Sequence, residues 1–176
     1  LGSVLDLGVP SDSTVSLAKL TATGTKSSST FLRGDNTFAE AGGGKVLQVV
    51  TANESANHSI TSTSYVNSSN GLTLNITPTA TTSKIFIMVS IPKFFAPSGQ
   101  NMFLTVYKAS SNIGGTSGLA LHGGFSEAIP ASFSIMDSPS STSQLTYQVY
   151  AKTSGGTSNY GDSDGRSTIT AFEIGA

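Results

Sequence analysis

From Lys45 onward, apolar and polar residues alternate with a period of two, and this pattern constrains the fold more than any other feature of the chain. Successive side chains of a β-strand point to opposite faces, so such alternation predicts strands with one buried face. Segments with this pattern, or with a short apolar run, lie at 46–50, 60–66, 72–76, 84–91, 102–107, 119–121, 131–136, 144–151 and 167–174. Turn-forming pairs such as Asn70-Gly71 separate them, and no segment shows a helical period. We therefore predict an all-β, antiparallel jelly-roll or β-sandwich domain over 45–176.

The segment 84–91 is apolar at nearly every position rather than at every second one. Strands of that kind are usually covered on both faces. We therefore expect this strand at the centre of the domain, with Ile87 and Val89 in the core.

The composition excludes several classes of function. Charged residues make up only 11% of the chain and the net charge is −1, whereas a nucleic-acid partner requires a basic surface. The hydrophobic fraction of 37% suffices for a packed core, unlike that of disordered chains. The chain has no Cys, which excludes disulfides and thiolate metal sites, and we expect no cofactor and no bound metal.

Residues 1–44 have a different character and end in Gly42-Gly43-Gly44. Their few apolar residues, such as Val15, Leu17 and Phe31, are not enough to form a core within one chain. Small units of this kind gain stability by packing against copies of themselves. We therefore predict an extended, intertwined shaft and collar segment over 1–44; a disordered linker is the alternative.

Several phrases of the sequence, in their order, resemble the distal part of tail fibres of bacteriophages, especially marine ones such as cyanophages. The phrases are Ser13-Thr14-Val15-Ser16-Leu17-Ala18-Lys19-Leu20, Thr30-Phe31-Leu32-Arg33-Gly34-Asp35, Ile76-Thr77-Pro78, Asp137-Ser138-Pro139 and Ser167-Thr168-Ile169-Thr170-Ala171-Phe172-Glu173-Ile174. Phe38 stands where the family more often has Trp, and Asn36 where it often has Gly. The resemblance covers the shaft, the collar and the C-terminal head.

The resemblance implies a structural virion protein that is not an enzyme. The head would be a jelly roll of the type seen in trimeric tumour-necrosis-factor-like and C1q-like proteins, so we expect a homotrimer. Its other partners would be a host-surface glycan or protein, and other tail proteins held through a part of the fibre that precedes this sequence. The alternatives are a head fibre or capsid decoration protein, a short polysaccharide-degrading or esterase domain, and a C1q-like protein of cellular origin.

Strand order indicates where a receptor would bind. Consecutive antiparallel strands place alternate loops at the same end of a domain, so the loops 92–100, 123–130 and 152–165 are expected to lie together. Exposed aromatic rings suit the apolar faces of sugars, and carboxylates accept hydrogen bonds from sugar hydroxyls. The expected receptor-binding residues in and beside these loops are Phe95, Phe125, Tyr160, Asp162, Asp164 and Arg166. The alternative for Tyr160 and Phe125 is that both rings pack beneath their own loops.

The sequence shows no catalytic motif. His58 and His122 are isolated from other catalytic residue types along the chain, and no Gly-x-Ser-x-Gly segment occurs. The run from Asn159 to Gly165 has only part of the spacing of a calcium loop.

Overall fold

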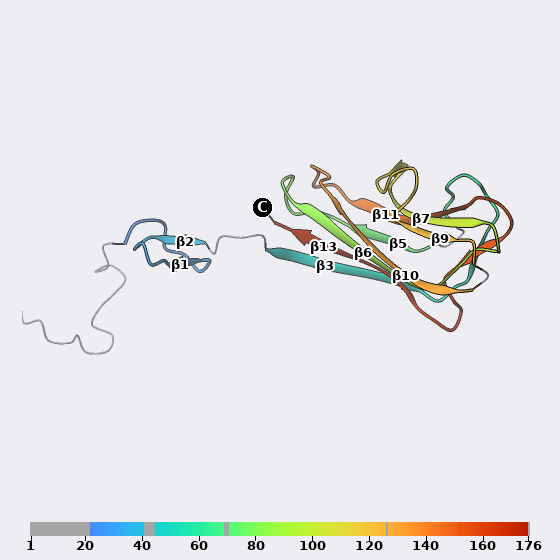
Figure 1. Ribbon diagram of the computed structural model, residues 1–176. Coiled ribbons are helices and arrows are strands. Elements are labelled where there is room, and N and C mark those ends of the chain that lie inside the picture. The colour runs from blue at the N-terminus through green and yellow to red at the C-terminus, as the bar shows by residue number, and fades with distance from the viewer. Residues whose placement is uncertain (1–21, 41–44, 69–70, 126, 176) are drawn as a thin grey trace, which may run out of the picture. The chain divides into compact units, whose positions relative to one another are not determined.

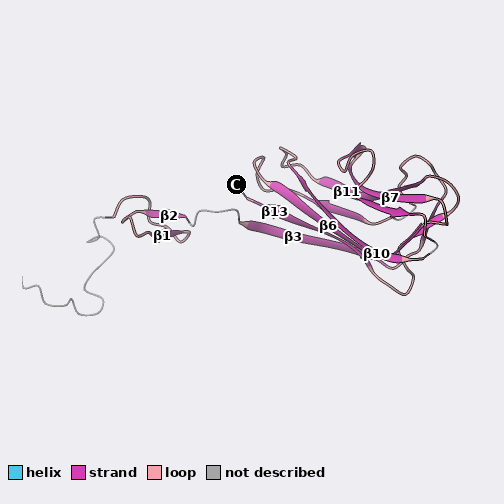
Figure 2. Cartoon of the chain, in the orientation of Figure 1, coloured by secondary structure: helices cyan, strands magenta, loops and turns pink. Residues whose placement is uncertain are grey.

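The computed structural model describes residues 22–40, 45–68, 71–125 and 127–175, which form strands and loops without a helix (Figures 1 and 2). The prediction of an all-β chain is confirmed. The chain divides into two compact units, residues 1–43 and 44–176. Within the described residues, no helix is long and apolar enough to span a membrane. Residues 1–21 and 41–44 of the predicted shaft and collar lie outside the described residues.

The described part of the first unit contains a small β-hairpin. Strands β1 (Thr30–Leu32) and β2 (Phe38–Glu40) pair antiparallel. In the turn, Asn36 adopts a φ of 62°, which Asn tolerates better than most residues, and the Thr37 hydroxyl donates to Asp35 Oδ1 over 2.6 Å. Phe31 remains 62% exposed, so the hairpin buries little of its own apolar surface.

The second unit, which we call the head, contains two antiparallel sheets. In the first sheet β13 lies between β3 and β6, and β10 flanks β6 on its other side (Figure 1). Two short strands, β4 and β12, extend this sheet beside the last residues of β6. The bounds are β3 (Val46–Glu54), β4 (His58–Ile60), β6 (Lys84–Phe95), β10 (Ile129–Asp137), β12 (Ser158–Tyr160) and β13 (Ser167–Ile174).

The second sheet packs over the first and completes a jelly-roll sandwich. Its path runs β5, β11, β7 and β8, and β9 pairs with the other half of β7. The bounds are β5 (Thr73–Ile76), β7 (Asn101–Lys108), β8 (Ser111–Asn112), β9 (Ala120–Gly123) and β11 (Leu145–Thr153). The strand expected over 60–66 is wrong in its bounds, because β4 shares only Ile60 with it. The Ser62 hydroxyl donates to the Ser64 carbonyl and accepts the Ser64 N–H, which bends the chain after β4.

Strand β6 is central, as predicted, but only one of its faces is buried. Ile85, Ile87, Val89 and Ile91 point into the sandwich and are at most 1% exposed. On the opposite face Met88 is 45% exposed. The expectation that both faces are covered is therefore wrong for the single chain, whose second sheet covers one side only.

Glu173 fastens the loop between β5 and β6 to the first sheet. Its buried carboxylate accepts hydrogen bonds from Gln48 Nε2 at 2.6 Å and from the N–H and hydroxyl of Thr79, each at 2.7 Å. Burial raises the pKa of Glu173, but the hydrogen bonds outweigh it and hold the pKa at about 2.

Replacing Ile87 with Asp should abolish folding, because an unpaired charge in this core costs several kcal/mol (about 3–5). Ser90→Asp, on the exposed face of the same strand, is the matched control. Thermal unfolding followed by circular dichroism measures both, and a cooperative transition in Ile87→Asp near the wild-type temperature would contradict the assigned core.

Acidification should destabilise the head between pH 4.5 and pH 2. Glu173 has a lower pKa in the folded state than its ordinary 4.5, so the unfolded chain takes up the proton first and stability falls with pH across this interval. Glu173→Gln should unfold at a lower temperature at pH 6, by about 1–3 kcal/mol of stability, and lose this part of the acid dependence. Equal melting curves at pH 6 for the two proteins would show that the carboxylate is not stabilising.

Candidate functional site

The three long loops do lie at one end of the head, as strand order predicts. The Gly124 N–H donates to the Gln100 carbonyl over 2.9 Å, and the Ser154 hydroxyl donates to Gln100 Oε1 over 3.0 Å. The opposite end carries the start of β3, where the Gly175 N–H donates to the Lys45 carbonyl over 2.8 Å. We call the loop-bearing end the distal end, because it lies farthest from the point where the chain enters the head.

The six expected receptor residues differ in their exposure. Phe125 is 76% exposed at the distal end. Asp164 and Arg166 are also exposed, while Asp162 and Phe95 are half-buried. Phe125 lines a hollow of about 330 Å³, together with the backbone and side chains of Leu121, His122, Gly123, Glu127 and Ile129.

Tyr160 is a correction, because its ring is fully buried and has no surface to offer a receptor. It stacks on His58 with ring centroids 4.7 Å apart, and burial raises the pKa of its hydroxyl. The reason is strand parity: in β12, Ser158 and Tyr160 point inward and Asn159 points outward. A period-two reading of these three residues would have placed Asn159, not Tyr160, at the surface.

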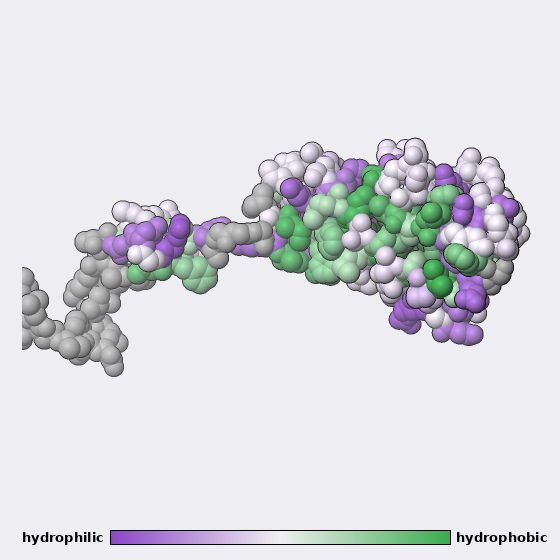
Figure 3. Space-filling view, in the orientation of Figure 1, coloured by the Kyte–Doolittle hydropathy of each residue, from purple (hydrophilic) through white to green (hydrophobic). Residues whose placement is uncertain are grey.

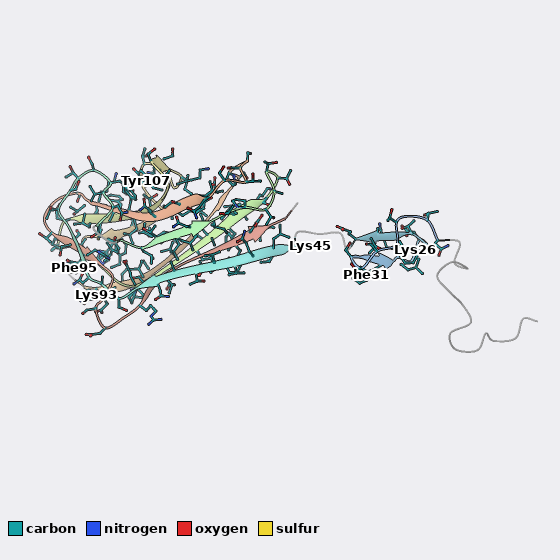
Figure 4. The ribbon with its side chains drawn as sticks, turned by 180° about the vertical axis from the view of Figure 1, so that it is seen from behind. Lys26, Phe31, Lys45, Lys93, Phe95 and Tyr107 are labelled. Carbon is teal, nitrogen blue, oxygen red and sulfur yellow. The ribbon has the colours of Figure 1, made fainter. Side chains whose placement is uncertain are left out.

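Asn159 is part of a second distal hollow of about 250 Å³ that also includes Asn57, Lys93 and Phe95. Asn159 pairs with Phe95 across β12 and β6, and its Oδ1 accepts the hydroxyl of Ser59 over 2.8 Å. Figure 4 shows Lys93 and Phe95 close together at one end of the head and Lys45 at the other. The sequence analysis predicted Phe95 but missed Lys93 on the same strand, and Asn57 and Asn159, which come from other segments.

A hydrogen-bonded chain of Ser68, His58 and Glu54 was also missed. His58 Nδ1 lies 2.7 Å from Ser68 Oγ, and its Nε2 lies 2.9 Å from Glu54 Oε1. His58 and Glu54 are separated by one break between β3 and β4, whereas Ser68 comes from the loop before β5. These are the residue types of a nucleophile, a base and a carboxylate that orients the base.

The outer face of the first sheet is apolar over part of its length. Near the start of β3 this outer face has a shallow hollow of about 410 Å³, and we call the surface formed by its lining residues the apolar face. The lining residues are Val46, Phe86, Met88, Met136, Phe172 and Ile174. Figure 3 shows hydrophobic residues gathered over the first part of β3 and its neighbours. Among the outward side chains of β3, β6, β10 and β13, only Lys84 and Lys93, near opposite ends of β6, carry a charge.

Part of the outer face of the second sheet is covered by the chain itself. Thr105 points outward from β7, yet it is fully buried, and its hydroxyl donates to Asn112 Oδ1 over 2.9 Å. Lys152 Nζ donates to the Thr116 carbonyl over 2.9 Å and lies 4.5 Å from the centre of the Tyr65 ring. The loop after β7 thus closes one side of the sandwich, and the apolar face has no such cover among the described residues.

The comparisons with known proteins do not assign the chain to a family. No protein-family model and no curated protein matches it. Among solved structures, it is weakly similar to the VP2 subviral particle of infectious bursal disease virus, with 12% sequence identity and a TM-score of 0.35. The match covers 78% of this chain and 41% of the VP2 chain, so this chain spans less than half of the VP2 chain's length.

Association of copies through the apolar face would bury Met88, which is 45% exposed in the single chain, so Met88→Asp should then give monomers without unfolding the head. Leu121→Asp is the matched control, since Leu121 is an apolar residue that is 58% exposed on the other sheet. Light scattering gives the mass of each variant, and circular dichroism shows whether it folds. Loss of association in both variants, or in neither, would contradict the assignment of this face.

Proposed function

We propose that this chain is the distal part of a phage tail fibre, a structural virion protein that assembles as a homotrimer and binds a host-surface glycan or protein. The observation that carries the proposal is the uncharged apolar face on the first sheet. Monomeric proteins rarely leave a continuous apolar patch of this kind in water, so it marks a surface for association. A second copy of the same head is the simplest partner, because all copies present the same face.

The proposal that three copies assemble is supported by the resemblance of the collar and head phrases to trimeric phage fibres. The hairpin of the first unit fits the same assembly, because Phe31 and Leu32 are exposed in one chain and need partners. Three copies about an axis would bury the apolar faces toward that axis and leave the second sheets outward.

Receptor binding draws support from the position of the long loops. They lie at the end of the head opposite the start of β3, the strand with which the chain enters the head. Exposed Phe125, Asp164 and Arg166 give this end an aromatic ring and both signs of charge. Binding sites are commonly built from such loops on a rigid β scaffold.

Binding of the fluorescently labelled protein to a panel of marine bacterial cells tests the receptor proposal. Phe125→Ala and Asp164→Ala should each reduce cell binding severalfold and keep the melting temperature within a few degrees. Thr142→Ala, an exposed residue of the opposite end, is the control and should bind as the parent does. Binding to virus capsids but to no cells would instead support the decoration-protein alternative and contradict the receptor proposal.

A second candidate function, ester hydrolysis, is favoured by one observation, the chain of Ser68, His58 and Glu54. In such an arrangement His58 would accept the Ser68 proton as the hydroxyl attacks the carbonyl carbon of an ester, and Glu54 would stabilise the imidazolium. The imidazolium would then return the proton to the alcohol that leaves as the ester C–O bond breaks, which gives an acyl-serine. Water would then release the acid and restore the serine.

Release of p-nitrophenol from p-nitrophenyl acetate decides between catalysis and a structural role. A hydrolase would lose at least a hundredfold in rate in Ser68→Ala and keep it in Ser64→Ala, a nearby exposed serine. If the parent protein and both variants release p-nitrophenol no faster than buffer without protein, the hydrogen bonds among Ser68, His58 and Glu54 only hold the loop before β5 against the first sheet.

A further inference from the structure

We propose that the distal hollow of Asn57, Lys93, Phe95 and Asn159 binds one sugar ring that bears a carboxylate, such as a glucuronate unit of a surface polysaccharide. The inference rests on the proposed function, because it names the ligand class of the same distal end. It starts from Lys93, whose side chain makes no hydrogen bond or ion pair with the described part of the chain.

Lys93 is held in place through its backbone while its ammonium group stays available. The Lys93 carbonyl accepts the Gly161 N–H over 2.8 Å, which fixes the end of β6 beside β12. The side chain leaves the sheet on the outward face and lines the hollow. Lys93 is half-buried as a residue. An ammonium group that has no partner among the described residues favours an anionic ligand, since a charge-assisted hydrogen bond to a carboxylate is roughly twice as strong as a neutral one.

Phe95 supplies the second requirement of a sugar site. It lies two residues beyond Lys93 on the same face of β6 and also lines the hollow. Its ring can cover the apolar C–H face of a pyranose, which removes apolar surface from water. Lys93 and Phe95 together therefore match a ring that has an apolar face and a negative group at its edge.

The two asparagines supply neutral hydrogen-bonding groups for hydroxyls. Asn159 Oδ1 is occupied by Ser59, so the Asn159 amide is turned with its NH2 group free to donate. Asn57 offers both a donor and an acceptor from the break between β3 and β4. A volume of about 250 Å³ is below the range of drug-sized pockets, roughly 300–1,000 Å³, which suits a single ring rather than an oligosaccharide.

Carboxylates in the loop next to Lys93 favour a ligand with a single negative charge. Asp162 and Asp164 lie in the loop between β12 and β13 that follows Gly161, but neither lines the hollow. Their negative charge near Lys93 would oppose a doubly charged phosphate more than a carboxylate. A carboxylated sugar is therefore favoured over a phosphorylated one.

Nuclear magnetic resonance titration of the purified chain with methyl glucuronide, methyl glucoside and inorganic phosphate tests the inference. We expect methyl glucuronide to bind with a dissociation constant near the millimolar range and at least tenfold tighter than methyl glucoside, with phosphate weaker still. Lys93→Met should remove the preference for glucuronide while keeping weak binding of glucoside. Phe95→Ala should weaken both sugars by at least fivefold.

Lys84→Met is the matched control, because Lys84 is an exposed lysine at the other end of β6. Equal binding of glucuronide and glucoside by the parent, tighter binding of phosphate, or the same loss in Lys84→Met as in Lys93→Met would overturn the inference. The titration uses no host cells, so its failure leaves the receptor proposal to the cell-binding measurement. Conversely, glucuronide binding without any cell binding would support this site and contradict the proposed function.

Discussion

The head depends on one physical constraint: a six-stranded sheet that is apolar on its inner face and on part of its outer face, and a second sheet that covers only the inner face. Ile87 and Val89 are buried against the second sheet, but Phe86 and Met88, which alternate with them along the same strand, point outward. Side chains of this kind gain about 1.5–3 kcal/mol each when they are fully buried. A single chain leaves that gain unused at its apolar face, and assembly about an axis would recover it.

The outer face of the first sheet changes from apolar to polar along its length, which would let the proposed association and receptor binding use different parts of it. Near the start of β3, Val46, Phe172 and Ile174 make the outer face apolar. Farther along, Ser90, Ser132 and Thr168 make it polar, and beyond them Lys93 and Phe95 line the distal hollow. Association and recognition can thus use one continuous surface without competing for the same residues, because a charged group such as Lys93 is costly in a dry interface.

Much of the fold could be predicted from the sequence, because alternation reports which face of a strand is buried. The strand at 84–91, the sandwich and the gathering of three loops at one end all followed from period and parity. The same parity explains why Tyr160 was misplaced: Ser158, Asn159 and Tyr160 are too few residues for their alternation to stand out in a loop rich in polar residues. Neighbours from different segments, such as Ser68 and His58 or Asn57 and Lys93, leave no local sequence pattern, because only the three-dimensional fold brings them together.

Thiol labelling of a Met88→Cys variant tests the central claim, that copies of the chain cover the apolar face, most directly. The chain has no other cysteine, and Met88 is 45% exposed in the single chain, so its reaction rate reports whether another copy lies over it. We expect Cys at this position to react with a maleimide at least tenfold more slowly than Cys at exposed Ser64, and to react equally fast once the protein is unfolded. Equal rates for the two folded variants would contradict the account.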